Sequence, residues 1–284
     1  MRVIVALGQV LDPRGIVVKR RAGRIFVNRE EYILQPADRC ALEAALRIKE
    51  ATGAEVVALP RGPLPDDDVL RQALATGADR AIYFVGQVGN LPHAGDASMA
   101  RVLAAAVERL GGADLILTGA TTMDTGQGQL GPRLAEALGW PQIVGVWQVE
   151  ATDGQVQAVL QKGTDYVTVE ADLPAVVTIL PGALKPRYPD GVRLINVYRA
   201  DDAVEKWDVS DPSTGSGQAP STGLTATSTR GGRAGLVDEA ALQPLLEKRG
   251  QDFPPERERG VRLSGTPEEM AQALADALRQ RVRG

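Results

Sequence analysis

LILTGATTMDTGQGQLGP, residues 115–132, is the most informative segment of the chain, because it joins a strand pattern to a helix pattern through a loop of small residues. Its apolar start, Leu115-Ile116-Leu117, predicts a buried strand, and Leu130, Leu134 and Leu138, spaced by four, predict a helix. A loop of small residues between a strand and a helix start suits an anion, because the first helix amides lack partners and glycines allow close approach. The loop composition fits a phosphate or nucleotide site, but it also fits a plain strand–helix connection.

On the N-terminal side of this stretch, short apolar runs alternate with helical patterns. Asp38 is expected to cap the first helix. The alternation predicts a doubly wound α/β fold, with a mostly parallel sheet and helices on both faces. The expected strands are Val3–Leu7, Glu55–Leu59, Ala81–Val85 and Asp114–Leu117, and the expected helices are Asp38–Lys49, one that begins at Asp66–Asp68, Met99–Leu110 and Leu130–Leu138.

On the C-terminal side the pattern changes to consecutive strands. Four runs have strand character, and Asp153-Gly154 is typical of a hairpin turn between the first two. We expect these runs to form an antiparallel extension of the sheet. They are Ile143–Glu150, Val156–Gln161, Asp165–Val169 and Ala175–Leu180.

The last part of the chain differs in composition. Residues 211–235 are rich in Ser, Thr, Gly and Pro, and we expect a flexible linker there, because they bury too little apolar surface to offset their ordering entropy. We therefore predict a nucleotide-binding domain over 1–210 and a helical arm over 236–284. The arm contains a helix over Pro267–Val282, with Thr266 and Glu269 as a capping box.

Charge and composition exclude several classes of protein. The chain has 284 residues, a net charge of −4 and 4% aromatic residues, so a nucleic-acid partner is not expected. One cysteine and one histidine cannot form a disulfide or a Cys/His metal cluster. We expect Cys40 to be a packed thiol and His93 to lie in an exposed loop. No apolar stretch reaches membrane-spanning length, and the expected location is cytoplasmic.

Five segments together point to one protein family. They are Val5–Asp12 (compare V-x-V-K-Q-V-x-D), Gln35–Asp38 (N-P-x-D), Ala73–Ala81 (A-L-A-M-G-A-D-R-A), Met123–Pro132 (I-D-G-D-x-x-Q-x-G-P) and Lys185–Pro189 (E-P-R-Y-P). In this order and spacing, roughly residues 1–200 resemble the beta subunit of electron transfer flavoprotein, a group that includes the FixA proteins.

The resemblance implies an electron carrier subunit without catalytic residues of its own, rather than a stand-alone enzyme. It implies a heterodimer with an alpha subunit that holds a redox-active FAD. The beta subunit of this family binds AMP, or a second FAD in the bifurcating and FixA-like members. Electrons would come from an acyl-CoA dehydrogenase or another dehydrogenase and pass to an acceptor such as a quinone oxidoreductase. The arm over 236–284 fits the family's C-terminal arm, which reaches over alpha.

Carried over to this sequence, the family's nucleotide would lie against the ends of the first, second and fourth strands. This agrees with the general rule that parallel sheets bind ligands at the carboxyl ends of their strands. The implied cofactor-binding residues are Ala6, Gln9, Gln35, Pro36, Ala37, Asp38, Arg61, Gly62, Asp124, Thr125, Gly126, Gln127, Gly128, Gln129, Leu130 and Gly131. No metal ligands are implied.

Four positions depart from the family pattern. Gly8 stands where the family has Lys, which removes a cation near the phosphate. Gln35 stands in place of Asn, and Thr125-Gly126 in place of Gly-Asp, which makes the loop smaller and less acidic. Such a loop fits either AMP or the pyrophosphate of FAD, and the sequence leaves the two open.

A second hypothesis is a stand-alone adenine-nucleotide module of the universal-stress type, which has a related doubly wound layout. The chain lacks both an S-G-G-x-D-S pyrophosphatase loop and a Walker G-x-x-x-x-G-K-[ST] motif, which argues against ATP chemistry. This hypothesis also leaves the C-terminal tail unexplained.

Overall fold

A computed structural model describes residues 1–19, 24–85, 96–152, 154–208, 225–226, 235–236 and 266–282. The chain divides into two compact units, Met1–Glu247 and Lys248–Gly284. His93 and most of the predicted linker lie outside the described residues. Within the linker region, β14 (Thr225–Ala226) pairs antiparallel with β15 (Gly235–Leu236).

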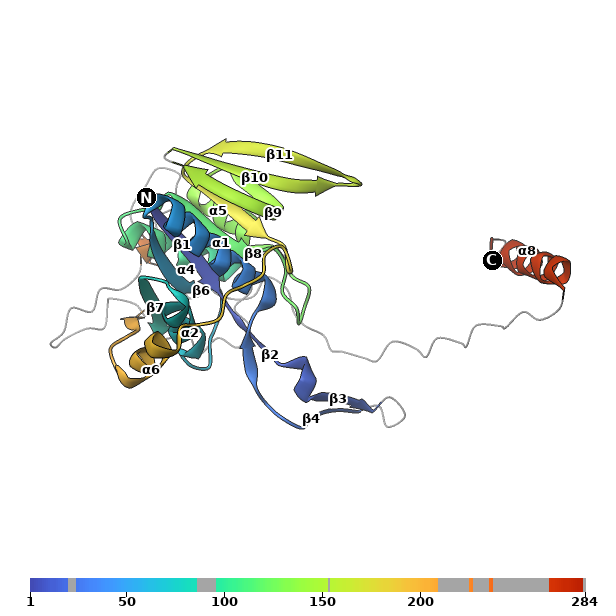
Figure 1. Cartoon of the computed structure of the whole chain (residues 1–284), viewed down its shortest axis with the longest axis horizontal. Helices are drawn as coiled ribbons and strands as arrows, with labels where there is room; N and C mark the ends of the chain where they lie inside the picture. Colours follow the sequence, from blue (N-terminus) through green and yellow to red (C-terminus); the bar gives the residue numbers. More distant parts are fainter. Residues whose placement is uncertain are drawn as a thin grey trace. The chain divides into compact units, whose positions relative to one another are not determined.

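A nine-stranded sheet forms the centre of the first unit (Figure 1). Its order is β11-β10-β9-β12-β8-β1-β6-β7-β13. All neighbours from β9 to β13 in this order are parallel, and only β10 and β11 are antiparallel to their neighbours. The strands are β1 (Arg2–Leu7), β6 (Glu55–Pro60), β7 (Arg80–Val85), β8 (Leu115–Gly119), β9 (Gln142–Thr152), β10 (Gln155–Lys162), β11 (Asp165–Asp172), β12 (Ala175–Ile179) and β13 (Glu205–Asp208).

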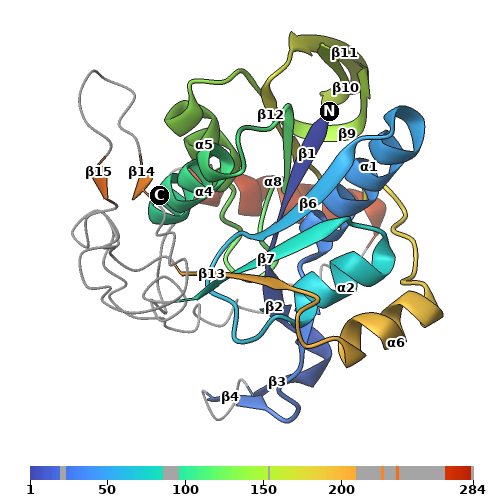
Figure 2. The same ribbon diagram turned by 90° about the vertical axis from the view of Figure 1, so that its left-hand side faces the viewer.

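Helices cover both faces of the sheet, which confirms the doubly wound prediction. Figure 2 shows α1 (Pro36–Thr52) and α2 (Asp68–Thr76) on one side of the strands, and α4 (Asp96–Arg109) and α5 (Leu130–Leu138) on the other. Each face of the sheet has its own hydrophobic core, and alternate residues of each strand point into one core or the other. Val3 and Val5 pack with α1, whereas Ile4 packs with α4 and α5.

The predicted antiparallel extension is only partly correct. Thr152 pairs with Gln155, so β9 and β10 form the expected hairpin, and β11 continues it. β12, however, lies between β8 and β9, is parallel to both, and is fully buried. Its continuous apolar run, Ala175-Val176-Val177, is typical of a central parallel strand that is covered on both faces. An antiparallel strand at the edge of the sheet, with one face exposed to solvent, would alternate apolar and polar residues instead.

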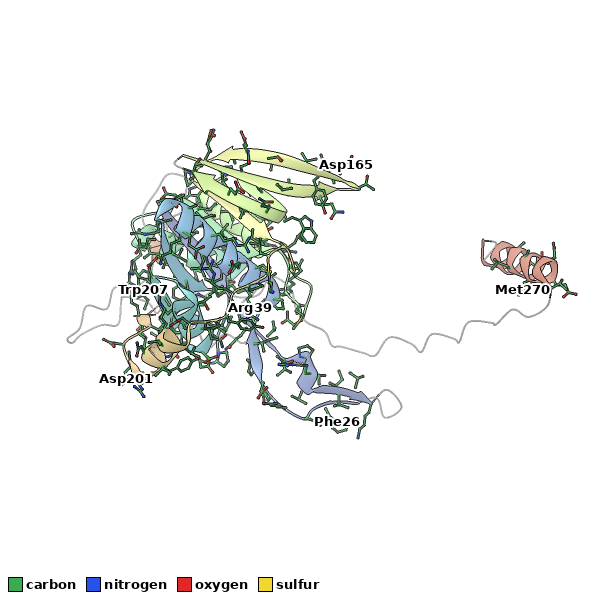
Figure 3. All side chains as sticks on the ribbon, in the orientation of Figure 1. Phe26, Arg39, Asp165, Asp201, Trp207 and Met270 are labelled. Atoms are coloured by element: carbon green, nitrogen blue, oxygen red, sulfur yellow. The ribbon has the colours of Figure 1, made fainter. Side chains whose placement is uncertain are left out.

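Several short elements were not predicted. β2 (Gln9–Leu11) pairs with β5 (Tyr32–Leu34). Between them lie the 3-10 helix η1 (Pro13–Gly15) and a hairpin of β3 (Ile16–Lys19) and β4 (Arg24–Val27), which projects from the sheet in Figure 1. Phe26, labelled on this hairpin in Figure 3, is 38% exposed. Helix α6 (Gly191–Arg199) is held against α2 by Arg71 of α2, whose guanidinium donates to the Val197 and Ala200 carbonyls.

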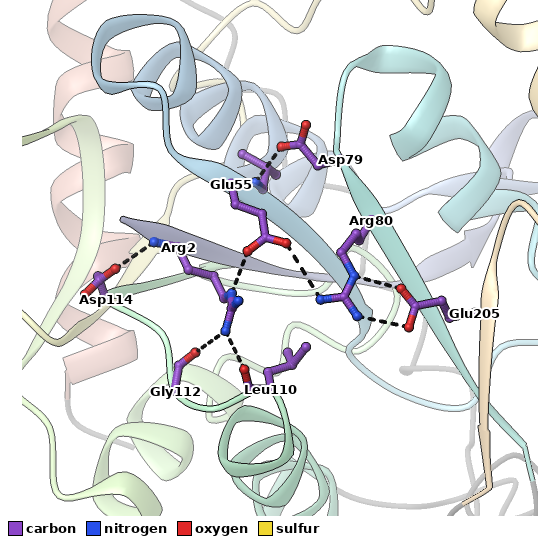
Figure 4. A network of polar contacts seen from close by, with 9 residues as sticks. Arg2, Glu55, Asp79, Arg80, Leu110, Gly112, Asp114 and Glu205 are labelled. Atoms are coloured by element: carbon purple, nitrogen blue, oxygen red, sulfur yellow. Dashed lines mark hydrogen bonds and ion pairs between the residues drawn. The ribbon is translucent and has the colours of Figure 1, made fainter. Parts of the chain in front are cut away.

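The amino ends of the strands are joined by a polar network (Figure 4). Arg2 Nε donates to Glu55 Oε2 at 2.7 Å, and Arg80 Nε donates to Glu205 Oε1 at 2.7 Å. The Arg2 backbone amide also donates to Asp114 Oδ2 at 2.6 Å. These contacts tie β13 and β8 to the centre of the sheet at the end opposite the predicted nucleotide site.

The described part of the second unit contains α8 (Pro267–Val282). The Thr266 amide donates to Glu269 Oε2 at 2.8 Å, and the Glu269 amide donates to Thr266 Oγ1 at 3.3 Å. This reciprocal pair is the predicted capping box. Among the described helices of both units, none combines the length and apolar character needed to cross a bilayer.

Candidate functional site

A buried ion pair lies where the predicted site residues converge. Arg61 Nη1 donates to Asp38 Oδ1 at 2.9 Å, and the two side chains are 6% and 0% exposed. Arg61 follows β6, and Asp38 lies in the first turn of α1. The pair therefore sits at the carboxyl ends of the central strands, where open α/β sheets bind ligands.

Asp38 does not cap its helix, contrary to the prediction. Gln35 is the N-cap residue, and it makes no side-chain capping bond. The Asp38 carboxylate instead accepts the backbone amides of Gly8, at 2.9 Å, and Gly119, at 2.9 Å. It thereby joins the ends of β1 and β8 to α1. This role depends on residues far away in the chain, so the local capping pattern did not predict it.

The environment of Asp38 has opposing effects on its acidity. Burial raises the pKa of the Asp38 carboxyl to about 6, although the Arg61 guanidinium and the Gly119 and Gly8 amides lower it. At neutral pH the group is therefore a carboxylate whose charge is balanced by Arg61. The site thus holds a fixed buried charge pair, rather than a free acid.

Glycine at position 8 is required by the path of Arg61. A Cβ built on Gly8 would lie 2.6 Å from both Cγ and Cδ of Arg61, so a side chain at position 8 and this Arg61 conformation exclude each other. Gly8 lacks the Lys side chain of the family pattern, but Arg61, which follows the neighbouring strand β6, passes close to Gly8 and brings a guanidinium into this region. The expected loss of a cation near the phosphate stays a prediction.

Gly119 meets a similar steric requirement on the other side of Asp38. A Cβ there would lie 2.3 Å from Asp38 Oδ1 and 2.7 Å from Ala37 Cβ. The absence of a side chain lets the start of α1 approach the end of β8 closely enough for the Gly119 amide to reach the carboxylate. Gly119 was not among the predicted site residues. Its position at the end of an apolar strand was the available signal.

Three buried polar atoms of the predicted site have no hydrogen-bond partner among the described residues. They are Gln9 Nε2, Gln35 Oε1 and Arg61 Nη2, and the one further such atom is the Trp147 indole nitrogen in β9. Gln9 pairs with Leu34 in the β2–β5 ladder, and the Gln35 amide donates to the Gly8 carbonyl at 2.9 Å, so the two glutamines belong to neighbouring backbone segments. Buried polar groups are normally paired. Here two donors and one acceptor without partners in the described part of the chain lie at the carboxyl ends of the strands. They suit a ligand such as a nucleotide, which offers both hydrogen-bond donors and acceptors.

Gln35 connects this centre to the loop after β8. Its Nε2 donates to the Thr121 carbonyl at 2.6 Å. In the loop, the Thr125 amide donates to Asp124 Oδ1, the Gly126 amide to the Thr122 carbonyl, and the Gln127 amide to Thr122 Oγ1. These three amides, at positions expected to face a phosphate, thus have partners inside the loop.

The start of α5 also has a partner within the chain. The Gln129 amide donates to Asp96 Oδ2 of α4 at 3.1 Å. A carboxylate therefore already lies at the helix terminus where the sequence analysis placed a ligand phosphate. Nothing in the sequence pattern of the loop predicted this contact with Asp96.

The structure separates the predicted residues into packing and polar groups. Ala6, Ala37, Leu130 and Gly131 are buried, and a Cβ on Gly131 would lie 2.3 Å from Thr178 Cγ2, so these four contribute to packing. Pro36, Gly62 and Gly128 are half-buried, and residues 124–127 and 129 are exposed. Hydrogen bonds bring together Gln35, Asp38 and Arg61 with the strand ends. Within the described residues, no three His, Cys, Asp or Glu side chains gather as a metal site would require.

Comparison with known proteins gives one consistent result. The profile of the electron transfer flavoprotein domain family matches residues 24–212. The chain is 27% identical to the electron transfer flavoprotein subunit beta of Bacillus subtilis, over 100% of this chain and 99% of that protein. It is 30% identical to Protein FixA of Bradyrhizobium diazoefficiens, over 98% and 91%. It is 26% identical to the acryloyl-CoA reductase electron transfer subunit gamma of Anaerotignum propionicum, over 99% of both.

Proposed function

Because the chain belongs to the family of electron transfer flavoprotein beta subunits and FixA proteins, we propose that it is the beta subunit of a heterodimer whose alpha subunit carries a redox-active FAD. In this proposal the heterodimer works in the cytoplasm. It takes electrons from an acyl-CoA dehydrogenase or another dehydrogenase and passes them to an acceptor such as a quinone oxidoreductase. The name of the Anaerotignum relative, which describes a reductase electron transfer subunit, supports a dehydrogenase or reductase as the redox partner.

We further propose that this chain binds its own nucleotide, AMP or FAD, at the carboxyl ends of β1, β6 and β8. The observation that carries this proposal is the set of buried polar atoms without partners on Gln9, Gln35 and Arg61. A ligand that offers acceptors to the two donors and a donor to Gln35 would remove the desolvation cost of all three. A bound FAD would supply a redox centre, whereas AMP would stabilise the fold by binding only the native state.

In this arrangement the chain contributes binding and positioning. Asp38 neutralises Arg61 and holds the ends of β1 and β8 at fixed distances from α1. Arg61 keeps Nη2 free for the ligand, because only Nη1 contacts Asp38. Gln35 orients the loop through the Thr121 carbonyl and keeps Oε1 free.

The first experiment is co-expression of the chain with its alpha partner, followed by quantification of the released nucleotides. We expect an alpha–beta complex that contains one FAD and one AMP, or two FAD and no AMP. The first result identifies a simple carrier with a structural nucleotide in beta, and the second identifies a bifurcating or FixA-like carrier. A chain that binds an adenine nucleotide but no alpha subunit would overturn the electron-transfer proposal and favour the stand-alone module.

Substitution of Gln9 tests the nucleotide site itself. Gln9→Met keeps a similar volume but removes the unpartnered amide, so the ligand loses a hydrogen bond while the apoprotein loses none. We expect nucleotide affinity to fall by about tenfold. Trp147→Phe is the matched control, because it removes the unpartnered donor that lies outside the predicted site. Equal nucleotide content in both variants would contradict the proposed site.

A further inference from the structure

A cavity of about 440 Å³ lies beside α1. It is bounded by β5, the first half of α1, the end of α2 and the turn over residues 182–189. Of the predicted cofactor-binding residues, only Pro36 lines it. In α1, Pro36, Arg39, Cys40 and Glu43 line it at the spacing i, i+3, i+4 and i+7, so one face of the helix forms its wall.

Apolar side chains from separate segments make up much of the lining. They are Ile33, Leu34, Leu42, Leu184, Pro186 and Pro189. Cys40 closes one side, because its Sγ donates to the Leu184 carbonyl at 3.4 Å. The polar part of the lining consists of Tyr32, Gln72, Thr76 and the charged residues Arg14, Arg39, Glu43 and Arg187. The volume falls within the usual range for small-molecule sites, roughly 300–1,000 Å³.

Two of the three arginines that line the cavity are already neutralised. Arg14 Nε donates to Asp12 Oδ2 at 2.8 Å. Arg187 Nε donates to Glu43 Oε2 at 2.9 Å, and Arg187 also pairs with Glu50. Burial raises the pKa of Glu43, but hydrogen bonds from Arg187 and Arg47 outweigh it and hold that pKa below its usual range. Glu43 is therefore ionised and its charge is satisfied.

Arg39 is the remaining cation of this cavity. Its side chain is exposed at the start of α1, where Figure 3 labels it, and its guanidinium has no hydrogen-bond or ion-pair partner in the described parts of the chain. A guanidinium presents a fork of donors that matches a carboxylate or a phosphate. The cavity thus combines apolar walls with one unbalanced positive charge.

We propose that this cavity binds an amphipathic anion, with its carboxylate or phosphate on Arg39 and its apolar body against Leu34, Leu42 and Leu184. This site is separate from the nucleotide site and does not depend on the proposed electron-transfer function. Carboxylate and phosphate head groups share the chemistry that Arg39 recognises, and the two are distinguished by the probes below.

Isothermal titration of the full chain tests the proposal with three probes that share an eight-carbon chain: octanoate, octyl phosphate and octanol. We expect one-to-one saturable binding of at least one anion, and binding of octanol weaker by about tenfold or more. A stronger signal for octanoate or for octyl phosphate identifies the preferred head group. Octanol binding as strong as that of both anions, or no saturable binding of either anion, would overturn the proposal.

Variants at Arg39 distinguish the contribution of its positive charge to anion binding from the contribution of its guanidinium geometry. Arg39→Gln should weaken the preferred anion by about tenfold, and Arg39→Lys should restore part of the loss. Arg199→Gln is the control, because Arg199 is also an exposed arginine of a helix but does not line the cavity. Unchanged binding in Arg39→Gln would refute the site. Loss of binding in the purified alpha–beta complex would also refute it, because the partner would then fill the cavity.

Discussion

Arg61 Nη1 lies 2.9 Å from Asp38 Oδ1, and this ion pair joins the end of one strand to the start of the preceding helix. Both side chains are almost completely buried. The Asp38 carboxylate also accepts two backbone amides, from residues 30 and 81 positions away in the sequence. One carboxylate therefore links β1, β8, α1 and the residue after β6 at the edge of the sheet where the proposed nucleotide binds.

Asp38→Ala should destabilise the protein by about 3–5 kcal/mol, because it leaves the buried Arg61 charge and the Gly8 and Gly119 amides without a partner. Denaturant unfolding of the full chain measures this change. Asp124→Ala is the matched control, since Asp124 is exposed and, within the described parts of the chain, its carboxylate accepts hydrogen bonds only from the neighbouring Thr125. We expect the control to stay within about 0.5 kcal/mol of the wild type. Similar losses in the two variants would contradict the structural role assigned to Asp38.

The pH dependence of stability should carry the signature of Asp38. Its pKa is raised to about 6 in the folded chain, so between the unfolded value of 3.8 and 6 the folded state binds more protons than the unfolded state. The contribution of this group to the unfolding free energy therefore falls as pH rises through that window, by roughly 1–3 kcal/mol. Subtraction of the Asp38→Asn curve from the wild-type curve isolates the effect. A difference that rises with pH would show that the folded-state pKa is depressed instead.

Gly119→Ala should destabilise the chain by about 1–3 kcal/mol, because the added Cβ meets Asp38 and Ala37 at distances well below van der Waals contact. Gly62→Ala makes the same chemical change one residue after Arg61, where a Cβ meets nothing within 4 Å. The two variants can be compared by thermal unfolding. The steric account fails if Gly62→Ala costs as much stability as Gly119→Ala.

Asp96→Ala should tighten nucleotide binding, provided that the phosphate of the proposed nucleotide lies at the start of α5. The substitution removes a carboxylate that occupies the Gln129 amide, and so it removes both a competitor and a repulsive charge. We expect AMP to bind about two- to tenfold more tightly to nucleotide-free protein, measured by calorimetry. Asp165→Ala, an exposed carboxylate at the start of β11, serves as the control. Weaker binding in Asp96→Ala would place the phosphate elsewhere.

The core of the fold was predictable because its signals are periodic. Val3, Ile4 and Val5 alternate between the two faces of the sheet, and the leucines of α5 follow the helical repeat. Helix α6 was not predicted, although Val192, Ile195 and Tyr198 follow helical spacing in its sequence. In the structure these three side chains are exposed, so the apolar stripe of α6 does not face the core.

The position of β12 illustrates what an apolar run does not specify. The run Ala175-Val176-Val177 predicts a strand, but its composition does not specify which strands lie next to it in the sheet. Only the assembled sheet inserts this strand between β8 and β9, and this insertion makes it parallel. The hairpin of β9 and β10 was easier to predict, because its turn residues act over a short distance in the chain.

The alternation of strands and helices, the capping box of α8, the family, and the segments that supply the candidate site were all predictable from the sequence, because they depend on local periodicity and short motifs. Which residues contact one another depends on the folded chain. The tertiary structure brought Arg61 over Gly8 to Asp38 and placed Asp96 on the Gln129 amide. It also left the Arg39 guanidinium beside a cavity without a partner among the residues that the structure describes. These contacts join residues far apart in the chain, and their energies depend on burial, which exists only once the sheet and helices have packed.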